Sequence, residues 1–379
     1  MIRFDAVSKL YPDGTKAVDS LDLVAPTGQI TVFVGPSGCG KTTSLRMINR
    51  MVELTSGRIF IDDRDASTVP ATELRRGIGY VIQHAGLLPH RTIVDNVATV
   101  PLLMGQNRRQ ARKRAMELME LVGLAPALAR RYPAQLSGGQ QQRVGVARAL
   151  AGDPPVMLMD EPFSAVDPVV RAQLQQEFLR LQGELAKTIV FVTHDIDEAI
   201  KLGDQVAVMR PGGSLAQLAT PAELLARPHD AFVSGFVGRD RGYRALGFAP
   251  AGRVPLADEP AVRVGASVAE AREAAQGGWV LVVDDVNAPV GWLHVDRKDA
   301  DSNADVLIGD VNLGGTFARE DGTMRELLDS ALSSPCGRGV VVGSDGAVLG
   351  SVRVGQVVGL IEDLAGSAAM APAVGPTGG

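Results

Sequence analysis

The chain contains 379 residues, of which 45% are hydrophobic, and this length accommodates two domains or three small ones. Its formal net charge of −5 and isoelectric point near 5.6 argue against nucleic acid as the principal partner. Charged residues interrupt the first ten positions, and no run approaches the roughly 18 apolar residues that cross a bilayer, so we expect neither a signal region nor a membrane span. The two cysteines, Cys39 and Cys336, lie far apart and suggest neither a metal pair nor a disulfide framework.

A glycine-rich loop is the first motif in the chain, Gly35-Pro-Ser-Gly-Cys-Gly-Lys-Thr-Thr43. It fits the pattern G-x-x-x-x-G-K-T and lies between an expected strand at 30–34 and an expected helix at 41–49. Such a loop directs backbone N–H groups and a helix N-terminus at phosphate oxygens. We expect Lys41 to reach the β- and γ-phosphates and the Thr42 hydroxyl to coordinate Mg²⁺. The residues expected to surround the phosphates are Gly35, Pro36, Ser37, Gly38, Cys39, Gly40, Lys41, Thr42 and Thr43.

A second motif, Leu136-Ser-Gly-Gly-Gln140, follows about a hundred residues later. Ser137, Gly138 and Gly139 lie where a helix is expected to begin, so they present a hydroxyl and free N–H donors to an anion. An ordinary serine-capped helix is the alternative. Beside the glycine-rich loop, however, this segment resembles the signature motif of ATP-binding cassette (ABC) ATPases. The resemblance implies that Ser137, Gly138, Gly139 and Gln140 contact ATP.

The next motif places two carboxylates side by side at the end of a strand. The run at 156–160 is apolar and ends in Asp160, which is typical of a buried parallel strand. The resemblance implies that Asp160 holds Mg²⁺ and that Glu161 activates the attacking water as a general base. Because the two residues are adjacent on an extended chain, we expect one side chain to face the metal and the other the γ-phosphate.

Four further roles rest on the resemblance. It implies that Gln83 contacts Mg²⁺ and senses the transporter, that His194 contacts the γ-phosphate, that Tyr11 stacks on adenine, and that the segment 164–167 crosses a dimer interface. The alternatives are a solvated loop residue for Gln83, a hydrogen-bonded neighbour for His194, and a core or turn aromatic for Tyr11. The motifs nevertheless occur in the family's order over about 160 residues, which favours one common site.

The C-terminal part contains an internal repeat. The block beginning at Leu281 aligns without a gap with the block beginning at Val340, so that Gly291 pairs with Gly350. Each block is expected to form strand, turn and strand, preceded by a helix at 268–275 or 324–332. The repeat resembles a tandem of cystathionine-β-synthase-type (CBS) domains, and a generic α/β appendage is the alternative. Residues 261–363 hold 8 Lys or Arg and 16 Asp or Glu, so this module is acidic.

The expected fold is α/β: a P-loop NTPase cassette with a RecA-like core and a helical subdomain, followed by a smaller α/β pair of CBS domains. Helices are expected at 108–121, inside the helical subdomain, and at 172–185. The expected divisions are a cassette at 1–241 with its helical subdomain at about 84–150, a linker at 242–260, CBS domains at about 261–312 and 313–363, and a disordered tail at 364–379.

A cassette followed by tandem CBS domains resembles the ATPase subunit of importers for glycine betaine, carnitine, choline or proline. The resemblance implies a homodimer of cassettes that hydrolyses ATP with Mg²⁺ at the cytoplasmic face of the membrane. It also implies two integral-membrane permease subunits, an extracytoplasmic substrate-binding protein, and an adenine nucleotide or ionic strength acting on the CBS pair. The alternatives are an importer for nitrate, a sulfonate or a polyamine, a soluble cassette protein of ribosomes or DNA repair, and a C-terminal half that is first a nucleotide-binding regulator.

Overall fold

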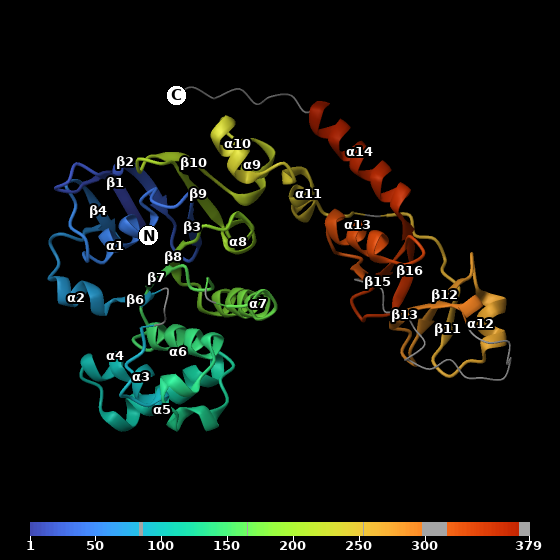
Figure 1. The fold of residues 1–379 in the computed structure, drawn as a ribbon, viewed down its shortest axis with the longest axis horizontal. Helices are drawn as coiled ribbons and strands as arrows, with labels where there is room; N and C mark the ends of the chain where they lie inside the picture. Colours follow the sequence, from blue (N-terminus) through green and yellow to red (C-terminus); the bar gives the residue numbers. More distant parts are fainter. Residues whose placement is uncertain (83–85, 165, 253, 298–316, 371–379) are drawn as a thin grey trace. The chain divides into compact units, whose positions relative to one another are not determined.

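The structure is a computed structural model that describes residues 1–82, 86–164, 166–252, 254–297 and 317–370 (Figure 1). The chain divides into two compact units, Met1–Arg239 and Asp240–Gly379. Within the described residues, no helix is both long enough and apolar enough to cross a membrane. Gln83 lies outside the described residues, so the role expected for it stays a prediction.

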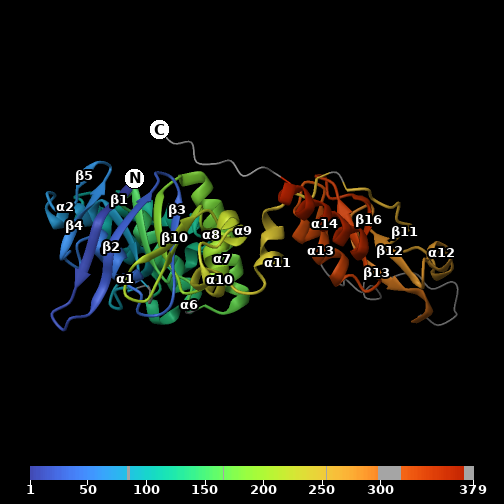
Figure 2. The same cartoon turned by 90° about the horizontal axis from the view of Figure 1, so that it is seen from above.

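The N-terminal unit is built on two sheets, and the antiparallel sheet lies to one side of the six-stranded sheet (Figure 2). The antiparallel sheet has the order β2 (Lys16–Ala25), β1 (Ile2–Leu10), β4 (Ser56–Ile61) and β5 (Arg64–Asp65). The second sheet has the order β10 (Leu215–Ala219), β9 (Gln205–Met209), β3 (Ile30–Val34), β8 (Thr188–Val192), β7 (Val156–Asp160) and β6 (Ile78–Val81). Strands β3, β7 and β8 are buried along their whole length, as expected for parallel strands covered on both faces.

The register of these three strands brings distant parts of the sequence to one edge. Phe33 of β3 lies opposite Val192 of β8, and Val192 lies opposite Asp160 of β7, with all three strands parallel. The carboxyl ends of β3, β8 and β7 therefore meet, and ligands bind at such an edge in open α/β sheets.

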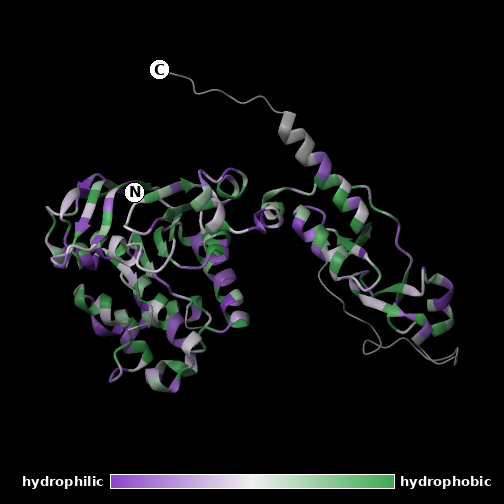
Figure 3. Cartoon of the chain, turned by 45° about the horizontal axis from the view of Figure 1, so that its top comes forward, coloured by the Kyte–Doolittle hydropathy of each residue, from purple (hydrophilic) through white to green (hydrophobic). Residues whose placement is uncertain are grey.

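Helices complete the N-terminal unit. The glycine-rich loop leads into α1 (Lys41–Ile48), and α7 (Pro168–Leu185) begins four residues earlier than expected because Asp167 caps it and proline suits its first turn. The other helices are α2 (Ala71–Arg76), α3 (Ile93–Val97), α4 (Thr99–Leu103), α5 (Arg108–Leu121), α6 (Gly138–Leu150), α8 (Ile196–Leu202), α9 (Pro221–Ala226) and α10 (Ala231–Val237), with 3₁₀ turns η1 (Pro126–Arg130) and η2 (Pro133–Gln135). Helices α3 to α6 form one group (Figure 1) and carry both hydrophilic and hydrophobic residues along their length (Figure 3), as a helical subdomain with one buried face requires.

The C-terminal unit contains two copies of one small fold. The first copy has β11 (Ala261–Arg263), α12 (Val268–Ala274), β12 (Trp279–Val283), β13 (Pro289–His294) and η4 (Val295–Arg297), and the second has β14 (Ala318–Arg319), α13 (Met324–Ser333), β15 (Arg338–Val342), β16 (Val348–Arg353) and α14 (Val354–Met370). Both sheets pair their first two strands parallel and their last two antiparallel. Gly291 lies opposite Val282 and Gly350 lies opposite Val341, each beside a register shift, with φ angles of 156° and 153°. The internal repeat expected from the sequence is therefore a structural repeat.

Two expected divisions are wrong. Residues 242–260 are not a free linker, because they form α11 (Arg241–Ala245) and η3 (Leu246–Phe248) and then pack Ala251 and its apolar neighbours on the second copy. The backbone of Ala257 also exchanges two hydrogen bonds of 2.9 Å with Ser351. Proline and glycine argue against helices and strands, but they do not prevent apolar side chains from packing. Residues 364–370, which were expected to be disordered, form the end of α14, since alanine and leucine favour helix, and residues 371–379 lie outside the described residues.

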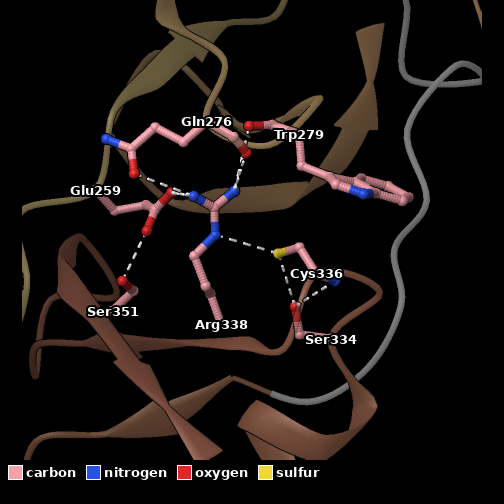
Figure 4. Close-up of polar contacts among 7 residues, drawn as sticks. All are labelled: Glu259, Gln276, Trp279, Ser334, Cys336, Arg338 and Ser351. Atoms are coloured by element: carbon pink, nitrogen blue, oxygen red, sulfur yellow. Dashed lines mark hydrogen bonds and ion pairs between the residues drawn. The ribbon is translucent and has the colours of Figure 1, made fainter. Parts of the chain in front are cut away.

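A buried arginine joins the two copies (Figure 4). Arg338 of β15 places its guanidinium 3.2 Å from the Glu259 carboxylate and donates to the backbone carbonyls of Gln276 and Trp279. It also lies 4.8 Å from the centre of the Trp292 ring. Both charged side chains are less than a tenth exposed, and the other carboxylate oxygen of Glu259 accepts from the Ser351 hydroxyl at 2.7 Å. The hydrogen bonds of the two side chains therefore offset part of the cost of burying their charges.

Candidate functional site

The glycine-rich loop folds around its own lysine. Lys41 is 6% exposed, and its ammonium donates to the carbonyl oxygens of Gly35 at 2.7 Å and Pro36 at 2.9 Å. The charge therefore lies inside the loop, at the start of α1, where the helix adds free N–H donors and partial positive charge. Burial raises the pKa of the Cys39 thiol, so this side chain is a neutral part of the loop wall rather than a nucleophile.

Two glycines of the loop have no room for a side chain. A Cβ on Gly40 would lie 2.0 Å from the carbonyl oxygen of Ala17, and one on Gly35 would lie 2.4 Å from that of Met209. Gly40 also has a φ angle of 90°, which favours glycine. Strands β2 and β9 thus press against the loop and hold its shape. Ser37 and Gly38 are exposed at its tip.

The two oxygen groups expected to hold Mg²⁺ are in contact. The Thr42 hydroxyl donates to the Asp160 carboxylate at 2.8 Å, although the residues are 118 positions apart. Burial raises the pKa of Asp160, while the hydrogen bond from Thr42 and the charge of Arg46 oppose that shift. A buried carboxylate beside a hydroxyl suits Mg²⁺, which prefers oxygen ligands and takes the rest from water and phosphate. These two residues therefore fit the metal.

Glu161 and His194 are the second pair that the sheet brings together. Nδ1 of His194 lies 3.2 Å from a carboxylate oxygen of Glu161. The expectation that Asp160 and Glu161 lie on an extended chain is wrong, because β7 ends at Asp160 and Glu161 has a left-handed φ angle of 46°. The backbone N–H of Glu161 donates to Val192 of β8 at 2.9 Å, which stabilises this turn. Such backbone strain is common at active sites, and here it directs Glu161 toward the segment after β8.

The signature segment begins α6 as expected. Ser137 caps the helix by accepting from the backbone N–H of Gln140, and the Gln140 side chain accepts from the backbone N–H of Ser137. This reciprocal capping box leaves the Ser137 hydroxyl proton available for another acceptor. Ser137 and Gly138 are exposed, so the segment presents its donors on the surface of the chain. Gln140 has a structural role in this arrangement, and its expected contact with ATP stays a prediction.

Tyr11 lies at the end of β1, near the strand that presses on the loop. Its ring is half-buried, and the Lys9 ammonium lies 5.1 Å from the ring centre. Its backbone N–H donates to Thr15, which closes the turn into β2. Stacking on adenine therefore remains a prediction for this ring.

Sequence reasoning missed Arg46. Its guanidinium lies 3.7 Å from the Asp160 carboxylate, so α1 contributes a positive charge beside the carboxylate that is expected to hold Mg²⁺. A signal was present, because Thr42 and Arg46 are four residues apart on one helix and therefore share a face. The Glu161–His194 contact had no such signal, since it depends on the order of the strands.

Comparisons with known proteins agree with this geometry. A family model described as ABC transporter matches residues 18–164. The glycine betaine/carnitine/choline transport ATP-binding protein OpuCA of Bacillus subtilis is 42% identical, over 88% of this chain and 90% of its own length. The choline transport ATP-binding protein OpuBA of the same organism is 41% identical, over 96% of this chain and 97% of its own length.

A solved structure extends the likeness to the fold. The dimeric post-hydrolysis state of the ATP-binding cassette MJ0796, bound to ADP and Pi, is 33% identical with a TM-score of 0.54. It covers 58% of this chain and 99% of its own. The predicted cassette fold and ATPase class are confirmed by these likenesses. The chain belongs to the ABC transporter family, in the group of ATP-binding subunits of osmoprotectant importers.

Proposed function

We propose that this chain powers the import of a quaternary ammonium osmoprotectant, such as glycine betaine, choline or carnitine, by hydrolysing ATP at the cytoplasmic face of a membrane. The observation that carries the proposal is the meeting of Lys41, the Thr42–Asp160 pair and the Glu161–His194 pair at one sheet edge. The choice of solute rests on relatives that align over most of both chains and are named for these solutes.

Each residue has a defined role in hydrolysis. Lys41 binds the β- and γ-phosphates, and the loop amides orient them. Bound Mg²⁺ would be held by Thr42 and Asp160, with Gln83 as a further ligand, and would neutralise phosphate charge. Glu161 accepts the proton of the attacking water, and His194 holds Glu161 in place and contacts the γ-phosphate.

The site is completed by a second copy of the chain. Ser137 and Gly138 are exposed and Gly139 is half-buried at the start of α6, and we expect all three to contact the γ-phosphate held by a partner chain. Tyr11 would stack on the adenine. Closing and reopening of this dimer would move two permease subunits, which receive the solute from an extracytoplasmic binding protein.

The C-terminal unit would regulate rather than catalyse. Every group assigned to hydrolysis lies in Met1–Arg239, and the repeats resemble a CBS pair. An adenine nucleotide bound between the copies, or ionic strength acting on their acidic surface, would supply the signal.

Uptake in cells tests the proposal. The chromosomal copy is replaced by Glu161→Gln, and uptake of labelled glycine betaine, choline, carnitine, proline, nitrate and a polyamine is compared with wild type at high osmolarity. We expect uptake of at least one quaternary ammonium solute to be lost. Loss of uptake confined to another solute class, such as nitrate or a polyamine, would overturn the choice of solute, and unchanged uptake of all would overturn the import role.

A further inference from the structure

Glu198 and Gln175 form a buried polar pair, and neither is assigned to hydrolysis. The pair contacts residues 193–198, which include His194 and are called the His194 segment here. Glu198, in the first turn of α8, is 7% exposed, and its carboxylate accepts from the Gln175 side chain of α7 at 3.0 Å. Gln175 is equally buried, and its own carbonyl accepts from Lys201 at 3.0 Å. Burial raises the pKa of Glu198, while hydrogen bonds from Thr193 and Gln175 oppose that shift. Moving a carboxylate out of water costs free energy, so hydrogen bonds from its neighbours must replace those it made to water.

The pair determines the shape of the segment that carries His194. Thr193, at the end of β8, is buried, binds Glu198 through its side chain, and accepts from the backbone N–H of Asp195 at 3.0 Å. The Asp195 carboxylate accepts in turn from the N–H groups of Asp197 and Glu198, which caps α8. His194 is therefore held between two residues that are both tied to this network.

Helix α7 extends the same connection toward the signature segment. It begins after the 164–167 segment, and a Cβ on Gly139 would lie 3.3 Å from Val170 and 3.9 Å from Val166. One rigid helix thus touches the signature segment at its start and the His194 segment two turns later. These two segments would serve different ATP molecules in the proposed dimer.

We propose that Gln175 and Glu198 are positioning residues that fix the His194 segment to α7 and so hold His194 against Glu161 for hydrolysis. This inference rests on the proposed ATPase function of the site. A displaced histidine would slow the chemical step far more than it would weaken ATP binding, because small misplacements at a reacting centre cost up to about 10²-fold in rate.

The test measures ATP hydrolysis and ATP binding by the full-length chain, with thermal unfolding to confirm folding. We expect Glu198→Ala to lower kcat at least about 10-fold with KM for ATP within about twofold of wild type. Glu198→Gln should restore most of the rate, since an amide oxygen still accepts from Gln175. The matched control is Gln182→Ala on the same helix, because Gln182 binds only the backbone of Gly28 and Lys187 among the contacts described for it, and it should leave kcat near wild type.

A double-mutant cycle separates positioning from general stability. In a His194→Ala background, Glu198→Ala should cause little further loss, because its effect passes through His194. Fully additive losses, or an equal loss in Gln182→Ala, would overturn the positioning role while leaving the ATPase assignment intact. A folded wild-type chain that hydrolyses no ATP with its permeases would contradict the proposed function and this inference together.

Discussion

Four side chains carry the proposed chemistry, and they follow three neighbouring strands. Lys41 follows β3, Asp160 is the last residue of β7 and Glu161 the next one, and His194 follows β8. None of them is close to another in sequence except the carboxylate pair, so the parallel register of the sheet creates the site. The proposed tasks differ accordingly: Lys41 and Asp160 would bind phosphate and metal, Glu161 would accept the proton of the attacking water, and His194 would hold Glu161 and contact the γ-phosphate.

Lys41→Ala and Glu161→Gln should therefore fail differently. Removing Lys41 takes the cation from the β- and γ-phosphates, so ATP binding and hydrolysis should both be lost. Glu161→Gln keeps the metal and phosphate contacts, so ATP should bind normally while hydrolysis falls about 10²-fold or more, the usual contribution of a general base. Binding of a fluorescent ATP analogue and steady-state phosphate release measure the two effects. Near wild-type hydrolysis in Glu161→Gln would remove Glu161 from its role.

For individual residues, the sequence predicted which residue types form the site better than it predicted their geometry. The glycine-rich motif and the end of an apolar strand each have a local pattern, and the structure brings Thr42 of the first into contact with Asp160 of the second. Their roles toward phosphate and Mg²⁺ stay predictions. The turn at Glu161 was missed, since its left-handed φ is stabilised by Val192 of another strand. Contacts across a sheet depend on strand order, which no local pattern records.

The strands around the glycine-rich loop leave no room for a side chain at Gly40. Gly40 combines a φ angle of 90° with a Cβ position 2.0 Å from Ala17, whereas Gly105 has a φ angle of 88° and open space around it. Both alanine variants should lose about 1–2 kcal/mol from the backbone conformation alone. Gly40→Ala should also displace β2 or the loop and abolish ATP binding, while Gly105→Ala should bind ATP normally. Equal behaviour of the two variants in unfolding and binding assays would contradict the steric argument.

In the C-terminal unit, the buried ion pair between Arg338 and Glu259 is the contact whose loss should destabilise the fold. Arg338→Ala would leave the Glu259 carboxylate buried without its cation, which should cost about 3–5 kcal/mol. Replacing both partners, as in Arg338→Met with Glu259→Leu, should recover most of that loss. Trp279 and Trp292 are the two tryptophans of the chain, so their fluorescence during urea unfolding reports this unit directly. If Arg338→Ala were as stable as the wild type, the ion pair would contribute nothing to the stability of this unit.

Regular elements were the most predictable part of the fold. The strands at 30–34 and 156–160 and the helix at 108–121 have the expected bounds, because each has a clear apolar period and a marked end. The segment at 242–260 was mistaken for a linker because its proline and glycine are visible in the sequence. The packing of its apolar residues against the second copy cannot be read from the sequence.

At the scale of the whole molecule, the acidic C-terminal unit is the part with a regulatory role to test. Rising salt screens repulsion between acidic surfaces within about 8–10 Å, which would let two such units approach in a dimer. Because the unit begins at Asp240, the deletion that removes it cleanly is 240–379. This deletion should preserve ATP binding and flatten the dependence of solute uptake on ionic strength. Coinciding salt curves for the deletion and the wild type would make the unit structural.

In the proposed dimer, two copies of the chain share each ATP site, with the glycine-rich loop from one and the signature segment from the other. Mixing inactive variants tests it most directly. Lys41→Ala and Ser137→Arg should each hydrolyse no ATP alone, because each homodimer lacks one half of both sites. In an equimolar mixture, heterodimers contain one complete site, and random pairing predicts up to about a quarter of the wild-type rate. A mixture as inactive as its separate components, with heterodimers demonstrably formed, would contradict the shared site.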